Sequence, residues 1–273
     1  MRPGSDRDDL AKIPVNDAGT SNDKNKRKFD GMGSMQNGLT NGQRFLDAFN
    51  SIERILRTRS SVDPTPGFSA LVSKSRDFVP RQRALLMDYA ELRNTIVHTR
   101  TLNGQLIADP RTDVVERIEE QADLIERPPK VIEALRLSPP HVFHERESIV
   151  EFLDVVKPPH YFSQAPVMTA DGQIELVTTN SVARWMAESW ETSQGVVLSE
   201  SSIRVILAHS EPGDRVEIRA KDLKVVEAWR IFSGEAGDPP AAILITNSGR
   251  RTEKPLGLCV RADLPAMLKT LKV

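Results

Sequence analysis

The spacing of apolar residues divides this chain into a helical first half and a second half of mixed character. From Phe45 to about Ile125, large apolar residues recur at steps of three and four, the period of a helix with one buried face. Four such helices follow one another with short connections, which predicts an antiparallel four-helix bundle over residues 43–130. The stripes are Phe45, Phe49, Ile52 and Leu56; Phe68, Leu71, Val72 and Phe78; Leu85, Tyr89, Leu92 and Ile96; and Val114, Ile118 and Leu124 or Ile125.

Beyond about residue 140, short β-like runs and amphipathic helices follow one another in an order that occurs twice. In each copy two β-like runs flank a turn, at Gly172 and at Gly249, and a helix comes next. A recurring order of elements indicates an internal duplication. We therefore expect two α-β-β-α repeats, at about 141–190 and 215–273, preceded by a linker at 131–140. The β-like runs are 165–169, 174–178, 241–246 and 256–260.

Composition adds expectations about the N-terminal segment, the binding partners and the cellular compartment. Residues 1–42 have hardly any large apolar residues, which predicts a disordered tail. The formal net charge is -1, so bulk charge gives no argument for a nucleic acid or a membrane partner. Cys259 is the single cysteine, so no internal disulfide forms and a reducing compartment is expected. Without an apolar run of about 20 residues or a signal core, the expected location is the cytoplasm.

The third predicted helix carries polar residues late in its sequence, on the side opposite its apolar stripe. Asn94 and His98 are four residues apart and can meet on one face, and Arg93 lies beside the stripe. A neutral His transfers protons near pH 7 and Arg binds phosphate, so two such sets in a homodimer suffice for metal-free RNA cleavage. The far face also carries apolar residues that favour a second copy, namely Leu86, Met87, Ala90 and Val97.

The Arg93-Asn94-x-x-x-His98 segment, late in the third of four helices, resembles the HEPN superfamily. The resemblance implies a dimeric, metal-independent endoribonuclease in which Arg93 holds phosphate, Asn94 orients the imidazole and His98 transfers the proton. A plainer interpretation pairs Arg93 with Glu91 or Asp88, leaves Asn94 in water and has His98 cap the helix end. Many HEPN members keep the fold without activity, so a bundle that only dimerises or docks a protein partner stays open.

The duplicated half resembles a tandem pair of CBS domains, an adenine-nucleotide-sensing module, through segments Pro166–Arg184 and Ala242–Leu264. The resemblance implies a Thr that binds phosphate and an Asp whose carboxylate accepts the ribose hydroxyls. Each repeat departs from this pattern, with Ser181 at the acidic place of the first and Val260 at the Thr place of the second. The ligand-binding residues that the resemblance implies are Thr178, Ser181, Arg184, Gly257 and Asp263.

Together these patterns predict an α+β multidomain protein, an all-α bundle followed by a tandem CBS pair. The first hypothesis is a dimeric regulator that senses AMP, ADP, ATP or S-adenosylmethionine and gates RNA cleavage. The rival is a sensor or adaptor without enzymatic activity. No metal site is predicted, since His141 and His144 would need Glu145 or His160 as a further ligand.

Overall fold

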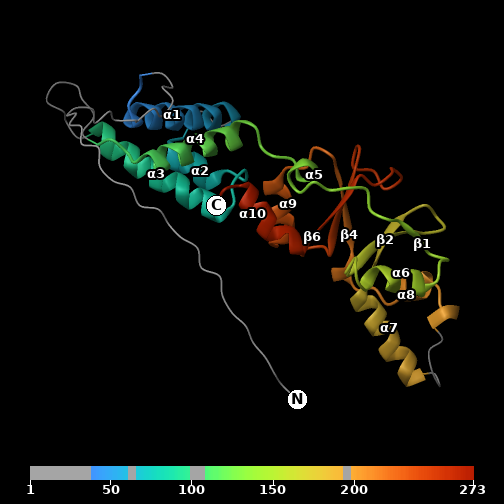
Figure 1. Cartoon of the computed structure of the whole chain (residues 1–273). Helices are drawn as coiled ribbons and strands as arrows, with labels where there is room; N and C mark the ends of the chain where they lie inside the picture. Colours follow the sequence, from blue (N-terminus) through green and yellow to red (C-terminus); the bar gives the residue numbers. More distant parts are fainter. Residues whose placement is uncertain (1–37, 61–65, 99–107, 193–197) are drawn as a thin grey trace, which may run out of the picture. The chain divides into compact units, whose positions relative to one another are not determined.

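The computed structural model of the protein describes residues 38–60, 66–98, 108–192 and 198–273. Most of the tail predicted at residues 1–42 lies outside the described residues, although Asn41 and Gly42 already belong to the first helix. Among the described residues up to 126 the regular elements are helices, and small sheets with helices follow (Figure 1). None of the helices among the described residues combines the length and the apolar character needed to cross a bilayer.

Four helices occur where the apolar stripes predict them. Thr40 caps the first, since its hydroxyl accepts a hydrogen bond from the Gln43 backbone N–H at 3.2 Å. The fourth ends just before Pro128 and Pro129, because proline lacks the N–H that would continue the helix. The four are α1 (Asn41–Arg59), α2 (Phe68–Lys74), α3 (Pro80–His98) and α4 (Thr112–Glu126).

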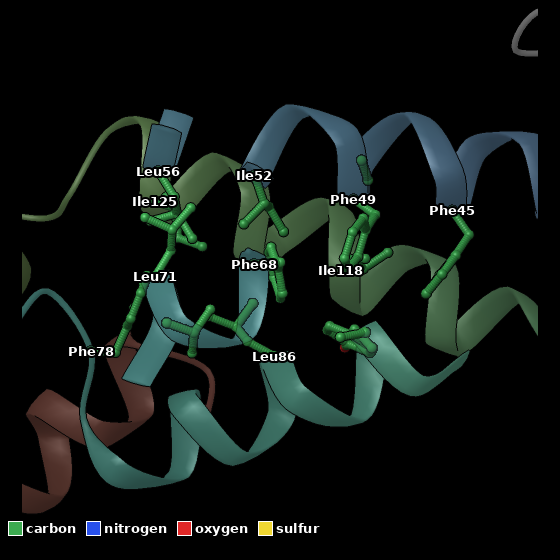
Figure 2. Packing of buried hydrophobic residues seen from close by; sticks show 14 of the residues in the cluster. Phe45, Phe49, Ile52, Leu56, Phe68, Leu71, Phe78, Leu86, Ile118 and Ile125 are labelled. Carbon is green, nitrogen blue, oxygen red and sulfur yellow. The ribbon is translucent and has the colours of Figure 1, made fainter. Parts of the chain in front are cut away.

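One apolar cluster joins these four helices. In Figure 2 the stripe of α1 points toward Ile118 and Ile125 of α4 and toward Phe68 of α2. The Phe49 and Phe68 rings lie 4.5 Å apart between centroids, and the buried stripe on α1 follows the predicted spacing of four, three and four. Packing of this stripe, more than helix propensity, therefore stabilises the helices.

Helix α3 is rotated about its axis relative to the prediction. Leu86 and Ala90, which we expected on the far face, are buried in the cluster together with Tyr89, whereas Leu85 and Leu92 are only partly buried. Apolar residues lie on more than half of the circumference of α3, so sequence periodicity alone selects no single face. Contacts with α1 and α2 decide which of them are covered.

The two repeats have the same sheet topology. In each, the first strand pairs parallel with the second, and the second pairs antiparallel with the third. Gly172 and Gly249 turn the chain after β2 and after β5 with φ of 76° and 81°, in the left-handed region that favours glycine. The first repeat comprises β1 (Phe143–His144), α6 (Ile149–Val156), β2 (Gln164–Met168), β3 (Ile174–Thr178) and α7 (Thr179–Thr192). The second comprises β4 (Val216–Ala220), α9 (Val225–Phe232), β5 (Ala242–Thr246), β6 (Gly257–Val260) and α10 (Leu264–Thr270).

Each repeat therefore reads β-α-β-β-α, with a first strand that the expected α-β-β-α order lacks. Strand β1 is only two residues long, too short to give an alternating pattern. In β4 the charged Glu217 and Arg219 alternate with apolar residues, and we did not recognise this run as a strand. The remaining strands and helices of the repeats lie where the sequence predicts them.

Residues 131–140, predicted as a linker, hold a short helix that packs on the second repeat. Val131 and Leu135 of this segment join the apolar cluster around α9 and α10, and the Val131 N–H donates to Leu223 O at 2.9 Å. A matching helix ahead of the second repeat packs on the first, through Ile203 and Ile206. Each leading helix thus crosses to the other repeat. These helices are α5 (Val131–Ala134) and α8 (Ile203–Leu207), and the single helical turns are η1 (Leu198–Glu200), η2 (Pro212–Asp214) and η3 (Arg261–Asp263).

A buried amide pair connects the helices to the second repeat. Gln82 of α3 donates from Nε2 to Gln121 Oε1 of α4 at 3.0 Å, and Gln121 Nε2 donates to the backbone oxygen of Leu271 at 3.2 Å. Both glutamines are at most 2% exposed. Since an unpaired buried amide costs free energy, this chain of hydrogen bonds favours one register of α4 against the end of α10.

Candidate functional site

The Arg93 side chain lies on the covered side of α3, next to the buried residues, whereas Asn94 is exposed. Its guanidinium lies 5.9 Å from the centroid of the Phe49 ring, and its Nε is buried with no hydrogen-bond partner among the described residues. Phe49, Arg93 and Asn94 line a cavity of about 450 Å³ between α1, α2 and α3. Arg57 lines it too, but its guanidinium pairs with Glu53 at 2.7 Å.

The structure describes the Asn94 side chain but not that of His98, the other two residues of the Arg93-Asn94-x-x-x-His98 segment. Asn94 is exposed, and its Oδ1 accepts a hydrogen bond from Arg93 Nη1 at 3.3 Å. His98 is the last residue of α3, and its side chain lies outside the described residues. Neither Glu91 nor Asp88 forms an ion pair with Arg93 among the described residues. The roles predicted for these three residues therefore stay predictions.

The first cleft is a cavity of about 470 Å³ between the repeats, and Thr178 and Arg184 both line it. Asp214, which the sequence did not single out, lies between them. Its Oδ1 accepts from Thr178 Oγ1 at 2.9 Å, and its Oδ2 is ion-paired with Arg184 Nη2. The lining residues are Ser163, Gln164, Thr178, Thr179, Asn180, Arg184, Glu211, Gly213, Asp214, Pro239, Ala241, Val260, Arg261 and Ala262, none of them aromatic among those the structure describes.

Further bonds fix this network in place. Asp214 Oδ2 also accepts the Glu211 N–H at 2.9 Å, Arg184 Nε donates to His209 O at 2.8 Å, and Glu211 Oε2 lies 3.5 Å from Arg184 Nη1. The Asp214 side chain is 8% exposed, so a charged pair is held here with little water. The donors that a bound anion would use at this point already serve Asp214.

Ser181 does not face the first cleft. It is 0% exposed, its hydroxyl donates to Thr178 O at 2.8 Å, and it accepts from the Thr178 N–H at 3.0 Å. It therefore fixes the start of α7. The ribose contact that the resemblance implies for this position requires a side chain accessible from the cavity, and Ser181 is buried.

The second cleft is another cavity of about 470 Å³, lined by residues of both repeats and of the segment after α5. Asp263 lies at its wall, where Oδ2 accepts the Val260 N–H at 2.8 Å and caps η3. The Cys259 thiol also hydrogen-bonds this carboxylate, whose two oxygens together keep further acceptor capacity, as the predicted ribose contact requires. The lining residues are Arg136, Leu137, Ser138, Pro139, Pro140, His141, Phe143, Val155, Tyr161, Phe162, Ser163, Gln164, Ala165, Pro166, Leu258, Val260, Ala262 and Asp263.

Aromatic side chains distinguish this cleft from the first. Tyr161 and Phe162 are 71% and 50% exposed, and the Phe162 ring lies 5.7 Å from the His160 ring between centroids. The His141 and Phe143 rings meet edge to face at 4.5 Å. The Arg136 guanidinium has no carboxylate partner within the described ranges. The sequence did not single out Arg136, Tyr161 or Phe162, since they precede or connect the elements that carry the family pattern.

Gly257, expected to contact a ligand, instead permits close packing. A Cβ at this position would lie 2.8 Å from Leu137 Cβ, closer than real contacts allow. The segment after α5 therefore rests directly on the start of β6, and Gly257 shapes the second cleft through Leu137. Next to it, burial and the nearby Asp263 carboxylate raise the pKa of the Cys259 thiol well above its usual range, which keeps the thiol neutral.

Metal ligands do not gather in the part of the chain that the structure covers. No group of three or more His, Cys, Asp or Glu side chains in these ranges could hold an ion. His144 is exposed at the end of β1, and Glu145 is buried beside Arg204, 3.9 Å from its Nη1.

Comparison with known proteins gives similarity to solved structures only. No family model matches the chain, and no curated protein matches it. The CBS domain of a CBS-domain-containing membrane protein from Sphaerobacter thermophilus is 16% identical with a TM-score of 0.39, covering 57% of this chain and 96% of its own. A CBS-domain-containing protein from Agrobacterium tumefaciens is 17% identical (TM-score 0.35; 52% and 92% covered), and CBSX2 in complex with AMP is 12% identical (TM-score 0.37; 51% and 97% covered). At this level of similarity no ligand or activity transfers to the chain.

Proposed function

We propose that the second cleft binds an adenine nucleotide and that the chain is a nucleotide-responsive regulator built on a CBS-like pair. The observation that carries this is one cavity of about 470 Å³ that holds exposed aromatic rings and a carboxylate with spare acceptor capacity. Cavities of roughly 300–1,000 Å³ with mostly apolar walls and a few polar groups are typical ligand sites. The base packs on the exposed aromatic side chains of this cleft, and Asp263 accepts the ribose hydroxyls.

Binding at this position offers a physical route to regulation. The second cleft is lined by both repeats and by the α5 segment, so a ligand there contacts three parts of the chain at once. A ligand shifts a conformational equilibrium by its difference in affinity between the two arrangements. Asp263 caps the turn that leads into α10, and the end of α10 is hydrogen-bonded to Gln121 of α4, which gives the proposed path to the helices.

The test is calorimetric titration of the full chain with AMP, ADP, ATP and S-adenosylmethionine, with thermal unfolding in parallel. A ligand at 100 times its Kd adds about 2.7 kcal/mol to the free energy of unfolding. We expect Asp263→Asn to weaken binding tenfold or more, since the amide keeps an acceptor for the Val260 N–H but loses the charge that holds the ribose.

The matched control is Asp222→Ala, an exposed aspartate ahead of α9 that lines neither cleft. It should leave affinity unchanged. Absence of heat and of any thermal shift with all four compounds at millimolar concentration would rule out the proposal.

We also propose metal-independent RNA cleavage by the helices as a second function. The observation in favour is the buried, unpaired Nε of Arg93 beside the cavity of about 450 Å³ that Asn94 also lines. An arginine placed in this way suits a phosphate oxygen. Incubation of the protein with RNA in a chelator, beside His98→Ala and Arg93→Ala, tests it. Equal cleavage by all three proteins, or none by any, contradicts this proposal and leaves the rival of a helical adaptor.

A further inference from the structure

Left-handed backbone positions gather at the second cleft. Outside glycine, the described residues with positive φ are Arg136 at 52°, Tyr161 at 55° and Lys272 at 58°. The first two line the same cavity, although 25 residues separate them in the chain. A side chain in this region is disfavoured by contact between its Cβ and the backbone, and glycine is the residue that avoids the cost. Strained positions of this kind concentrate at functional sites.

The turns themselves do not need these two side chains. The Arg136 N–H donates to Glu133 O at 3.3 Å and the Tyr161 N–H to Lys157 O at 3.3 Å, bonds that a glycine would make equally well. Tyr161 is 71% exposed and Arg136 is also exposed, so packing in the free protein does not offset the strain. Their identities are therefore better explained by something that enters the cavity.

The side-chain chemistry of Arg136 and Tyr161 indicates which group of a ligand each would contact. Val260 lacks the hydroxyl that Thr178 has at the matching place of the first repeat, so a phosphate in the second cleft needs another donor. A guanidinium can donate two parallel hydrogen bonds to a phosphate, and a phenol ring gives a base a flat apolar surface. The contact between Leu137 and Gly257 keeps the Arg136 backbone fixed at the cleft wall.

We infer that Arg136 binds the phosphate of the nucleotide and that Tyr161 stacks on its base. This rests on the proposed nucleotide binding and names its determinants. The two segments that carry these residues lie outside the strands and helices of the duplicated motif: one follows α5, and the other joins α6 to β2. Phosphate recognition here therefore belongs to this chain and not to the repeat pattern.

The experiment separates phosphate from base by titrating AMP and adenosine into the full chain and into two glycine variants. Arg136→Gly should lower AMP affinity tenfold or more and leave adenosine affinity within twofold. Tyr161→Gly should lower both by similar factors. The Tm without ligand should change by less than about 2 °C, because relief of the left-handed strain offsets the greater freedom of glycine in the unfolded chain.

Lys272→Gly is the matched control, since Lys272 has the same backbone conformation but lines neither cleft. It should leave both affinities unchanged. If wild type binds AMP and Arg136→Gly binds it equally well, the present inference is wrong and the proposed function stands. If wild type binds neither AMP nor adenosine, both fail. A fall in AMP affinity with an equal fall in adenosine affinity for Arg136→Gly would overturn the phosphate assignment.

Discussion

The two clefts between the repeats have the same volume, about 470 Å³, yet their walls offer different chemistry. In the first, the buried Asp214 already engages the hydroxyl of Thr178 and the guanidinium of Arg184. In the second, Arg136 has no carboxylate partner within the described ranges, and aromatic rings are exposed beside it. The two clefts therefore have equal volumes but different lining side chains.

The difference originates in the segments that cross between the repeats. The segment after α8 supplies Asp214 to the first cleft, and the segment after α5 supplies Arg136 to the second. These crossing segments are not part of the repeated strands, so their residues are free to differ. The distinguishing charge of the first cleft, Asp214, lies on the segment that leads into the second repeat. That of the second cleft, Arg136, lies on the segment that leads into the first repeat.

The largest effect is expected from Gly257→Ala. The added Cβ meets Leu137 at 2.8 Å, so the α5 segment must shift and the second cleft deforms. We expect a loss of about 1–3 kcal/mol in the free energy of unfolding, as for other overpacked positions, together with weaker nucleotide binding. Gly213→Ala is the matched change in the first cleft, where no atom lies within 4 Å of the new Cβ. Equal losses in the two variants, measured by urea unfolding, would contradict the packing argument.

Asp214→Asn should convert the first cleft into an anion site. The amide still accepts from Thr178, but it no longer neutralises Arg184, which then faces the cavity together with Arg261. Calorimetry with AMP should change from one binding event to two, and the lost charged bonds should lower stability by about 1–2 kcal/mol. Adding Arg184→Ala should restore a single event. A single event in both proteins would show that Asp214 does not block the cleft.

Val260→Thr should raise the affinity of the second cleft for AMP. It places a hydroxyl at the position that Thr178 occupies in the first repeat, on a residue that lines both cavities. One additional hydrogen bond to a charged phosphate should raise AMP affinity by up to about tenfold, or about 1.4 kcal/mol. Val205→Thr makes the same change on an exposed surface away from both clefts and should have no effect on affinity. Unchanged affinity in both would place the phosphate away from Val260.

The smallest effect concerns the turns between the paired strands. Hydrogen bonds from the Ser248 hydroxyl and N–H lower the pKa of Glu253 to about 2, and the Thr169 hydroxyl lowers the pKa of Asp171 in the first repeat. Because the folded pKa of Glu253 is depressed, its contribution to stability is complete above the unfolded pKa of 4.5 and is lost as pH falls toward 2. Carboxyl titration by NMR checks the pKa of Glu253 and the downward shift of the Asp171 pKa, and Glu253→Gln should remove this part of the pH dependence. An ordinary pKa for Glu253 would contradict the hydrogen-bonded turn.

Strong periodicity made most of the elements predictable. The stripe of Phe45, Phe49 and Ile52 could form only one buried face, and the glycine turns at Gly172 and Gly249 marked the paired strands. Weak periodicity failed in α3, where apolar residues cover more than half of the circumference and contacts with α1 and α2 selected the buried side. Arg93, predicted beside the apolar stripe, lies over the Phe49 ring on the covered side of the helix.

The sequence by itself determined the helices of the first half and the repeated order of strands and helices in the second. Only the tertiary structure decided that Asp214 meets Thr178, 36 positions away, and that Arg136 and Tyr161 line one cavity. The reason is physical. Local patterns fix which face of an element is buried, whereas a site forms from segments that are brought together only when the two repeats and their crossing segments pack.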